Sequence, residues 1–134
     1  MKHMTDNSQG LLRVMRILSA IVLIAAGGIH LFLVFDGTGG VLGVLFVLNA
    51  VAGIILGVAM LALRGRLLEL ASGLSLLFII ASFLSLALAL TVGLFGITVT
   101  WSFTLVPQTF VIEGIGILVL AATSALALRA RRTT

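Results

Sequence analysis

Three polar side chains interrupt otherwise apolar stretches of this sequence: His30, Asn49 and Glu113. An ionised carboxylate in the middle of a membrane costs about 2.5–3.5 kcal/mol on insertion scales, so Glu113 is expected to be protonated or paired. His30 is the only titratable partner at a comparable depth. We therefore expect His30 and Glu113 to meet inside the protein with Asn49 nearby, where they could handle a proton, a cation or a small ligand.

The same three residues also have purely structural interpretations. A histidine within a membrane can simply be hydrogen-bonded to a neighbouring helix, and Asn49 can hold two helices together. Glu113 is the hardest of the three to explain structurally, because acids inside a membrane are usually functional.

Few residues in this sequence could form any other kind of functional site. It has no cysteine, which excludes disulfides, thiol chemistry, cysteine-ligated zinc and iron–sulfur clusters. One histidine, one glutamate and one asparagine are too few for a zinc site, and no HExxH motif is present. The sequence shows no nucleophile–base arrangement and no phosphate-binding loop. We therefore expect neither a metal, nor a cofactor, nor an enzymatic activity.

The composition is that of a membrane protein. Of the 134 residues, 61% are hydrophobic and 9% are charged, against roughly 25% charged in an ordinary soluble domain. A net charge of +4 could suggest nucleic acid. The basic residues, however, flank apolar segments and are not mixed with aromatic residues in a patch. The expected partner is thus the lipid bilayer and not nucleic acid.

The hydropathy pattern predicts an all-α fold, a single transmembrane domain over residues 1–134 built as an antiparallel four-helix bundle. A spanning helix needs about 20 apolar residues. Four stretches meet this length. They cover residues 12–35, 41–63, 70–95 and 107–128. Between the last two, a loop around Trp101 is predicted to be an irregular segment anchored by the indole, with an extended, strand-like lip as the alternative.

The charges predict one orientation of this bundle. All eight basic residues lie in the two terminal segments or around residues 64–66, and only Asp36 lies on the other side among the connecting segments. Lys and Arg are enriched on cytoplasmic segments, so both termini are expected in the cytoplasm. We expect the chain to be a multi-pass protein of the plasma membrane that crosses it four times. With this topology His30, Asn49 and Glu113 all lie roughly 8–12 Å inward from the outer ends of their helices, at about 1.5 Å per residue.

Small residues at helical spacing predict where the helices pack. Gly53 and Gly57 form a GxxxG motif, and Ser75, Ser82 and Ala89 recur at intervals of seven residues. Small residues let helix backbones approach closely in lipid. The sequence alone leaves open whether these surfaces bind neighbours in the same chain or a second copy of it.

Several short segments resemble a group of small, uncharacterised four-helix membrane proteins of actinobacteria. The similar segments surround His30 and Asn49, cover the Val-Gly-Leu-Phe-Gly run at 92–96 and include a glutamate in the last helix. The start of the first helix is also similar to DoxX-type membrane proteins. The resemblance implies the four-helix topology and no particular activity.

Three functions are compatible with these features. The first is a non-enzymatic integral membrane protein, acting as an accessory subunit of a larger complex or as a homo-oligomer. The second is a small transporter or channel component that uses His30 and Glu113. The third is a protein that binds a lipid or a quinone in the outer leaflet.

Overall fold

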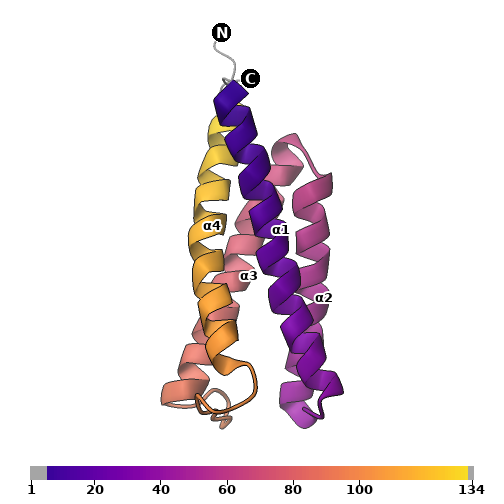
Figure 1. Cartoon of the computed structure of the whole chain (residues 1–134), viewed down its shortest axis with the longest axis vertical. Helices are drawn as coiled ribbons and strands as arrows, with labels where there is room; N and C mark the ends of the chain where they lie inside the picture. Colours follow the sequence, from indigo (N-terminus) through magenta and orange to yellow (C-terminus); the bar gives the residue numbers. More distant parts are fainter. Residues whose placement is uncertain (1–5, 133–134) are drawn as a thin grey trace.

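The computed structural model describes residues 6–132, and this part of the chain folds into four α-helices (Figure 1). The helices are α1 (Asp6–Phe35), α2 (Gly40–Ala62), α3 (Gly65–Thr91) and α4 (Val106–Arg132). Consecutive helices run antiparallel, and each is long and apolar enough to cross a membrane. The predicted all-α, four-helix architecture is confirmed.

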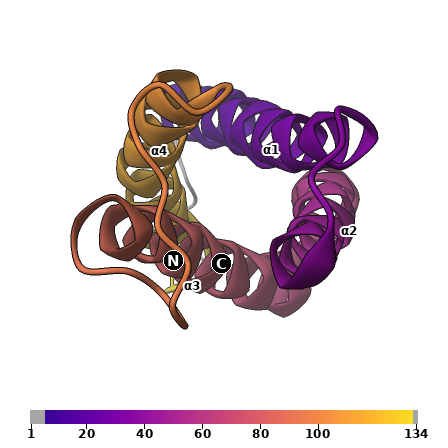
Figure 2. The same ribbon diagram turned by 90° about the horizontal axis from the view of Figure 1, so that it is seen from below.

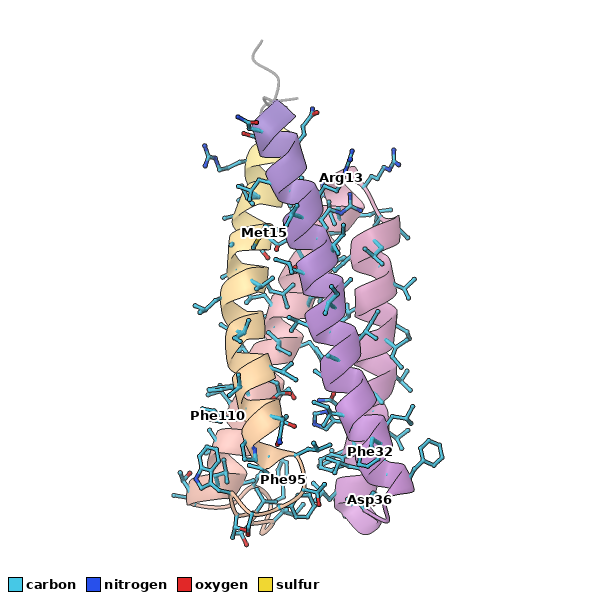
Figure 3. The ribbon with its side chains drawn as sticks, viewed as in Figure 1. Arg13, Met15, Phe32, Asp36, Phe95 and Phe110 are labelled. Carbon is cyan, nitrogen blue, oxygen red and sulfur yellow. The ribbon has the colours of Figure 1, made fainter. Side chains whose placement is uncertain are left out.

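The two ends of the bundle differ. Residues 6 and 132 lie at one end together with the short α2–α3 connection at residues 63–64, and we call this the termini end. The α1–α2 turn at residues 36–39 and the α3–α4 loop at residues 92–105 lie at the opposite end, which we call the loop end. The basic residue Arg13 is therefore at the termini end, and Asp36 is at the loop end (Figure 3).

The helices are not parallel rods, because two of them cross the bundle. α1 lies beside α4 at the termini end and beside α2 at the loop end (Figures 1 and 2). α3 does the reverse, passing from α2 to α4. At the loop end the bundle thus consists of two pairs, α1 with α2 and α3 with α4 (Figure 1).

Glycines bring α1 and α2 into backbone contact. A Cβ atom on Gly53 would lie 2.8 Å from the carbonyl oxygen of Leu23, and one on Gly27 would lie 3.0 Å from the carbonyl oxygen of Ala50. A Cβ atom on Gly57 would lie 2.6 Å from Cγ1 of the Ile24 side chain and 3.3 Å from the carbonyl oxygen of Ala20. The glycine-bearing face of α2 is therefore buried against α1 within one chain, and a second copy would have to use another surface.

The helix ends differ from those expected from hydropathy, which detects only the apolar part of a helix. α1 begins at Asp6, whereas the hydropathy pattern placed its start near residue 12. The pattern missed the first turns of this helix because they are polar. α3 covers residues 65–91 and not 70–95, and α4 extends from 106 to 132 and not from 107 to 128. α3 ends early because Gly93 adopts φ +94° and its N–H donates to the carbonyl of Leu88 at 2.7 Å, a conformation that favours glycine.

At the termini end Arg16 of α1 binds the end of α2. Its Nε donates to the carbonyl oxygen of Met60 at 2.9 Å, and its Nη2 donates to those of Leu61 and Leu63 at 3.2 and 2.7 Å. The last carbonyls of a helix have no partners within the helix and carry partial negative charge. Arg16 satisfies three such groups, so it has a structural role in addition to marking the basic side of the chain.

The core occupies the middle of the bundle and its termini end. Its largest fully buried apolar side chains come one from each helix. They are Leu23, Met60, Ile79 and Leu120. A hydrogen bond of 2.9 Å between the hydroxyls of Ser19 and Thr123 joins α1 to α4 in the same half of the bundle.

The α3–α4 loop is irregular, and residues 6–132 contain no β-strand. One isolated bridge pairs Leu94 with Ile97. The indole of Trp101 is 54% exposed and packs edge-on against Phe110 of α4, with 5.2 Å between ring centroids. Figure 3 shows Phe110 close to the loop end of α4. The loop is therefore an irregular segment that rests on α4 through its indole.

Candidate ligand-binding site

A chain of hydrogen bonds joins three helices near the loop end. Asn49 of α2 donates from Nδ2 to Oγ of Ser82 on α3 at 2.9 Å. The hydroxyl of Ser82 in turn donates to Oε2 of Glu113 on α4. Ser82 accepts one bond and donates the other, so its oxygen links the amide to the carboxyl group. The structure thus brings Asn49 and Glu113 together through a serine.

Two oxygen atoms of this cluster have no hydrogen-bond partner among residues 6–132. They are Oδ1 of Asn49 and Oε1 of Glu113, and both are buried. The whole side chain of Glu113 is inaccessible to solvent. A buried polar atom left unpaired costs about 1–3 kcal/mol, more if it is charged. Such atoms are rare in native structures and often mark a site for a ligand, an ion or water.

His30 lies near this cluster but has other partners. Its Nδ1 is 2.7 Å from the carbonyl oxygen of Ala26, one turn earlier in α1, and its ring packs edge-on against Phe46 of α2. Within the described chain, neither a hydrogen bond nor an ion pair connects His30 to Glu113. The contact expected between these two residues is not formed, because Ser82 binds the carboxyl group and Ala26 binds the imidazole.

The tautomer of His30 follows from its partner. A carbonyl oxygen can only accept, so Nδ1 carries the proton of this hydrogen bond. In the neutral ring Nε2 then has a free lone pair and acts as an acceptor.

A cavity of about 410 Å³ lies beside the cluster. His30, Asn49 and Ser82 contribute to its wall, and most of the other lining side chains are apolar residues of α2, α3 and the α3–α4 loop. Its volume falls within the roughly 300–1,000 Å³ of small-molecule sites, and an apolar wall with a few polar groups is typical of them. Leu48 of α2 and Ala81 of α3 line the cavity and are both exposed residues, which favours an opening to the surface between these two helices.

The cavity does not continue to the termini end within the described residues. Along each helix a fully buried apolar side chain follows the polar cluster in that direction: Leu23 after His30 on α1, and Met60, Ile79 and Leu120 on the other three. These four side chains belong to one packed core. The cavity is therefore closed toward the termini end in the part of the chain that the structure describes.

The predicted seam on α3 serves more than packing. Ser75 is fully buried, and its Oγ has no hydrogen-bond partner in the part of the chain that the structure describes. Ala89 is buried, lines the cavity and accepts a hydrogen bond from the backbone N–H of Val99 at 2.9 Å. Ser82 is the bridge of the polar cluster, a role that its seven-residue spacing did not reveal.

No metal site is found among the described residues, since nowhere in them do three or more His, Cys, Asp or Glu side chains gather. The polar groups available are thus one imidazole, one amide, one carboxyl group and several hydroxyls, which can hold a ligand by hydrogen bonds or exchange a proton with it.

Comparisons with known proteins add no assignment. No protein-family model, no curated protein and no solved structure matches this chain. Any function must therefore be argued from the site itself.

Proposed function

We propose that this chain is a multi-pass membrane protein that binds a small, largely apolar molecule in the cavity at the loop end. The observation that supports this proposal is the cavity of about 410 Å³ whose apolar wall carries the polar groups of His30, Asn49 and Ser82. Apolar walls would hold the body of such a molecule, and the polar groups would hold its head.

Binding is favoured over passage across the membrane because the cavity is closed at its inner end. A channel or a transporter in an open state needs a polar path to the other side. Here the four core side chains between the cavity and the termini end are apolar and fully buried. The opening between α2 and α3 suits a molecule that enters from the lipid.

The same proposal places the loop end outside the cell. The described basic side chains Arg13, Arg16, Arg64, Arg66 and Arg129 belong to the segments at the termini end. Basic segments stay in the cytoplasm, which supports cytoplasmic termini in a plasma membrane. The chain has no cysteine, so single cysteines can be introduced for labelling. Thr98→Cys should react with an impermeant thiol reagent added outside intact cells, and Arg66→Cys only after permeabilisation. The reverse pattern would overturn the orientation.

An accessory or oligomer-forming role stays a prediction from the sequence. The Gly53 and Gly57 face of α2, which was its best candidate surface, is covered by α1. This packing directs attention to the cavity as the functional feature.

Photolabelling in lipid nanodiscs tests the binding proposal. The probe is a medium-chain alkanol that carries a diazirine on its chain, and the labelled peptides are mapped by mass spectrometry. Labelling should concentrate on the cavity-lining parts of α2 and α3. Ala52→Phe, which places a ring in the cavity wall, should abolish it, whereas Ala121→Phe on the exposed side of α4 should not. Uniform labelling of all lipid-facing positions, unaffected by Ala52→Phe, would overturn the proposal.

A further inference from the structure

We infer that the molecule bound in the cavity presents a hydrogen-bond donor to the protein, as an alcohol or a phenol does. This inference rests on the proposed binding function and specifies the chemistry of the ligand's head group. It follows from counting which polar atoms at the cavity are still free to donate and which are free to accept.

The free atoms are mainly acceptors. Nδ1 of His30 is committed to the carbonyl of Ala26, which leaves Nε2 of the neutral ring as an acceptor. Oδ1 of Asn49 is a buried acceptor without a partner in residues 6–132. Both residues line the cavity.

Three of the four hydroxyl groups of the wall are already used as donors, and the fourth, that of Thr104, belongs to an exposed residue of the α3–α4 loop. Ser82 donates to Glu113. Ser85 and Thr109 donate to carbonyl oxygens of their own helices, those of Ala81 and Leu105, each at 2.7 Å. A hydroxyl has a single proton, so none of these three groups can donate to a ligand without breaking a bond that it now makes.

Asn49 presents one further group, the second N–H of its amide. Nδ2 has two protons and uses one for Ser82. The amide therefore offers an acceptor and a donor side by side. A hydroxyl group donates and accepts, so it matches this edge, and the lone pair of His30 is a second acceptor in the same cavity wall.

A ligand that only accepts would fit poorly. An ether, an ester or a ketone could take the one amide N–H, but it would cover the two acceptors and leave them unpaired. A site whose polar groups are left unpaired discriminates strongly against the analogue that lacks the donor. Because the loss of one hydrogen bond to a buried partner amounts to about a tenfold change in affinity, we expect at least about a tenfold preference for the donor.

Competition between two matched molecules tests the inference. A medium-chain alkanol and its methyl ether differ only in the ability to donate, and each is titrated against the diazirine probe in nanodiscs that contain the full chain. The measured quantity is the ratio of the two concentrations that halve cavity labelling. Differences in lipid partitioning are removed by comparing this ratio between wild type and variants.

Three variants define the expected pattern. In wild type the ether should need at least about ten times the concentration of the alcohol. In Asn49→Leu, and separately in His30→Phe, the ratio should fall toward the value set by partitioning alone. Thr91→Ala, which removes an exposed hydroxyl bonded to its own helix, should keep the wild-type ratio.

The outcomes separate this inference from the proposed function. If alcohol and ether both block cavity labelling and their ratio is the same in wild type, Asn49→Leu and His30→Phe, the site binds apolar molecules without selecting a donor, and the inference is wrong. If neither blocks it and Ala52→Phe has no effect, the binding function itself is wrong. If Asn49→Leu fails to fold, His30→Phe alone decides whether the site selects a donor, because the ring nitrogen Nδ1 of His30 bonds only within α1.

Discussion

Replacing Ser82 by alanine is the most direct perturbation of the polar cluster. The change removes one oxygen atom, and that oxygen links Asn49 to Glu113. Two buried groups lose a partner at once: Nδ2 of Asn49 loses its acceptor, and Oε2 of Glu113 loses its donor. Alanine is well tolerated in helices, so the effect reports on the hydrogen bonds.

The magnitude lies between two limits. Hydrogen bonds between helices in membranes contribute about 0.6 kcal/mol each on average, and two of them give about 1.2 kcal/mol as the lower limit. A single buried polar group that is left fully unpaired costs up to about 3 kcal/mol, which sets the upper limit. We therefore expect Ser82→Ala to lower the free energy of unfolding by about 1–3 kcal/mol.

The chain offers a matched control on the same helix. The hydroxyl of Ser85 lies one turn away and donates only to the carbonyl of Ala81 in its own helix. Ser85→Ala leaves no partner stranded, and its effect should stay within about 0.5 kcal/mol. Both variants can be compared by reversible unfolding in mixed micelles, followed by circular dichroism and by the fluorescence of Trp101.

A double-mutant cycle supplies the refuting result. If Ser82 bridges Asn49 and Glu113, then Ser82→Ala and Asn49→Leu share an interaction, and their effects should deviate from additivity by more than about 0.5 kcal/mol. Additive effects, together with equal losses for Ser82→Ala and Ser85→Ala, would show that the bridge does not stabilise the protein.

Three other substitutions test neighbouring parts of the structure by the same unfolding assay. Gly53→Ala should cost about 1–3 kcal/mol because the new Cβ would meet backbone atoms of α1, whereas Gly28→Ala, with open space around it, should be neutral or stabilising by up to about 1 kcal/mol. Arg16→Gln should cost up to about 2 kcal/mol through the lost bonds to the end of α2, and Arg13→Gln, whose side chain is exposed, should change stability by less than about 0.5 kcal/mol. Glu113→Gln keeps an acceptor for the serine hydroxyl and removes the ionisable group, so it should preserve the fold; a loss of more than about 3 kcal/mol would show that the carboxyl group is needed as a charge.

The four helices could be predicted from the sequence because each is marked by a long apolar stretch between charges or glycines. Their ends could not, since hydropathy stops where polar residues begin and a helix does not. The first turns of α1 and the last turn of α4 are polar or basic and still helical. At the end of α3, Gly93 was a readable stop signal that the apolar residues around it obscured.

The candidate site was predicted in part. Residue spacing places His30, Asn49 and Glu113 at similar depths, and the structure does bring Asn49 and Glu113 into one cluster. Depth, however, does not determine rotation of a helix about its axis or the choice of partner. His30 turns to its own backbone, and Ser82 takes the carboxyl group, because the crossing of α1 and α3 decides which side chains meet. The crossing itself depends on packing among all four helices.

The Arg16 bonds have a mechanical consequence for the cavity. They tie α1 to the end of α2 far from the site, in the half of the bundle where the apolar core already holds all four helices. Nearer the loop end the α1–α2 hairpin faces the α3–α4 hairpin across the cavity, and the bond from Asn49 to Ser82 joins the two hairpins. A ligand larger than the present space would therefore have to break the Asn49–Ser82 bond and tilt one hairpin away from the other, while the apolar core at the termini end stays closed.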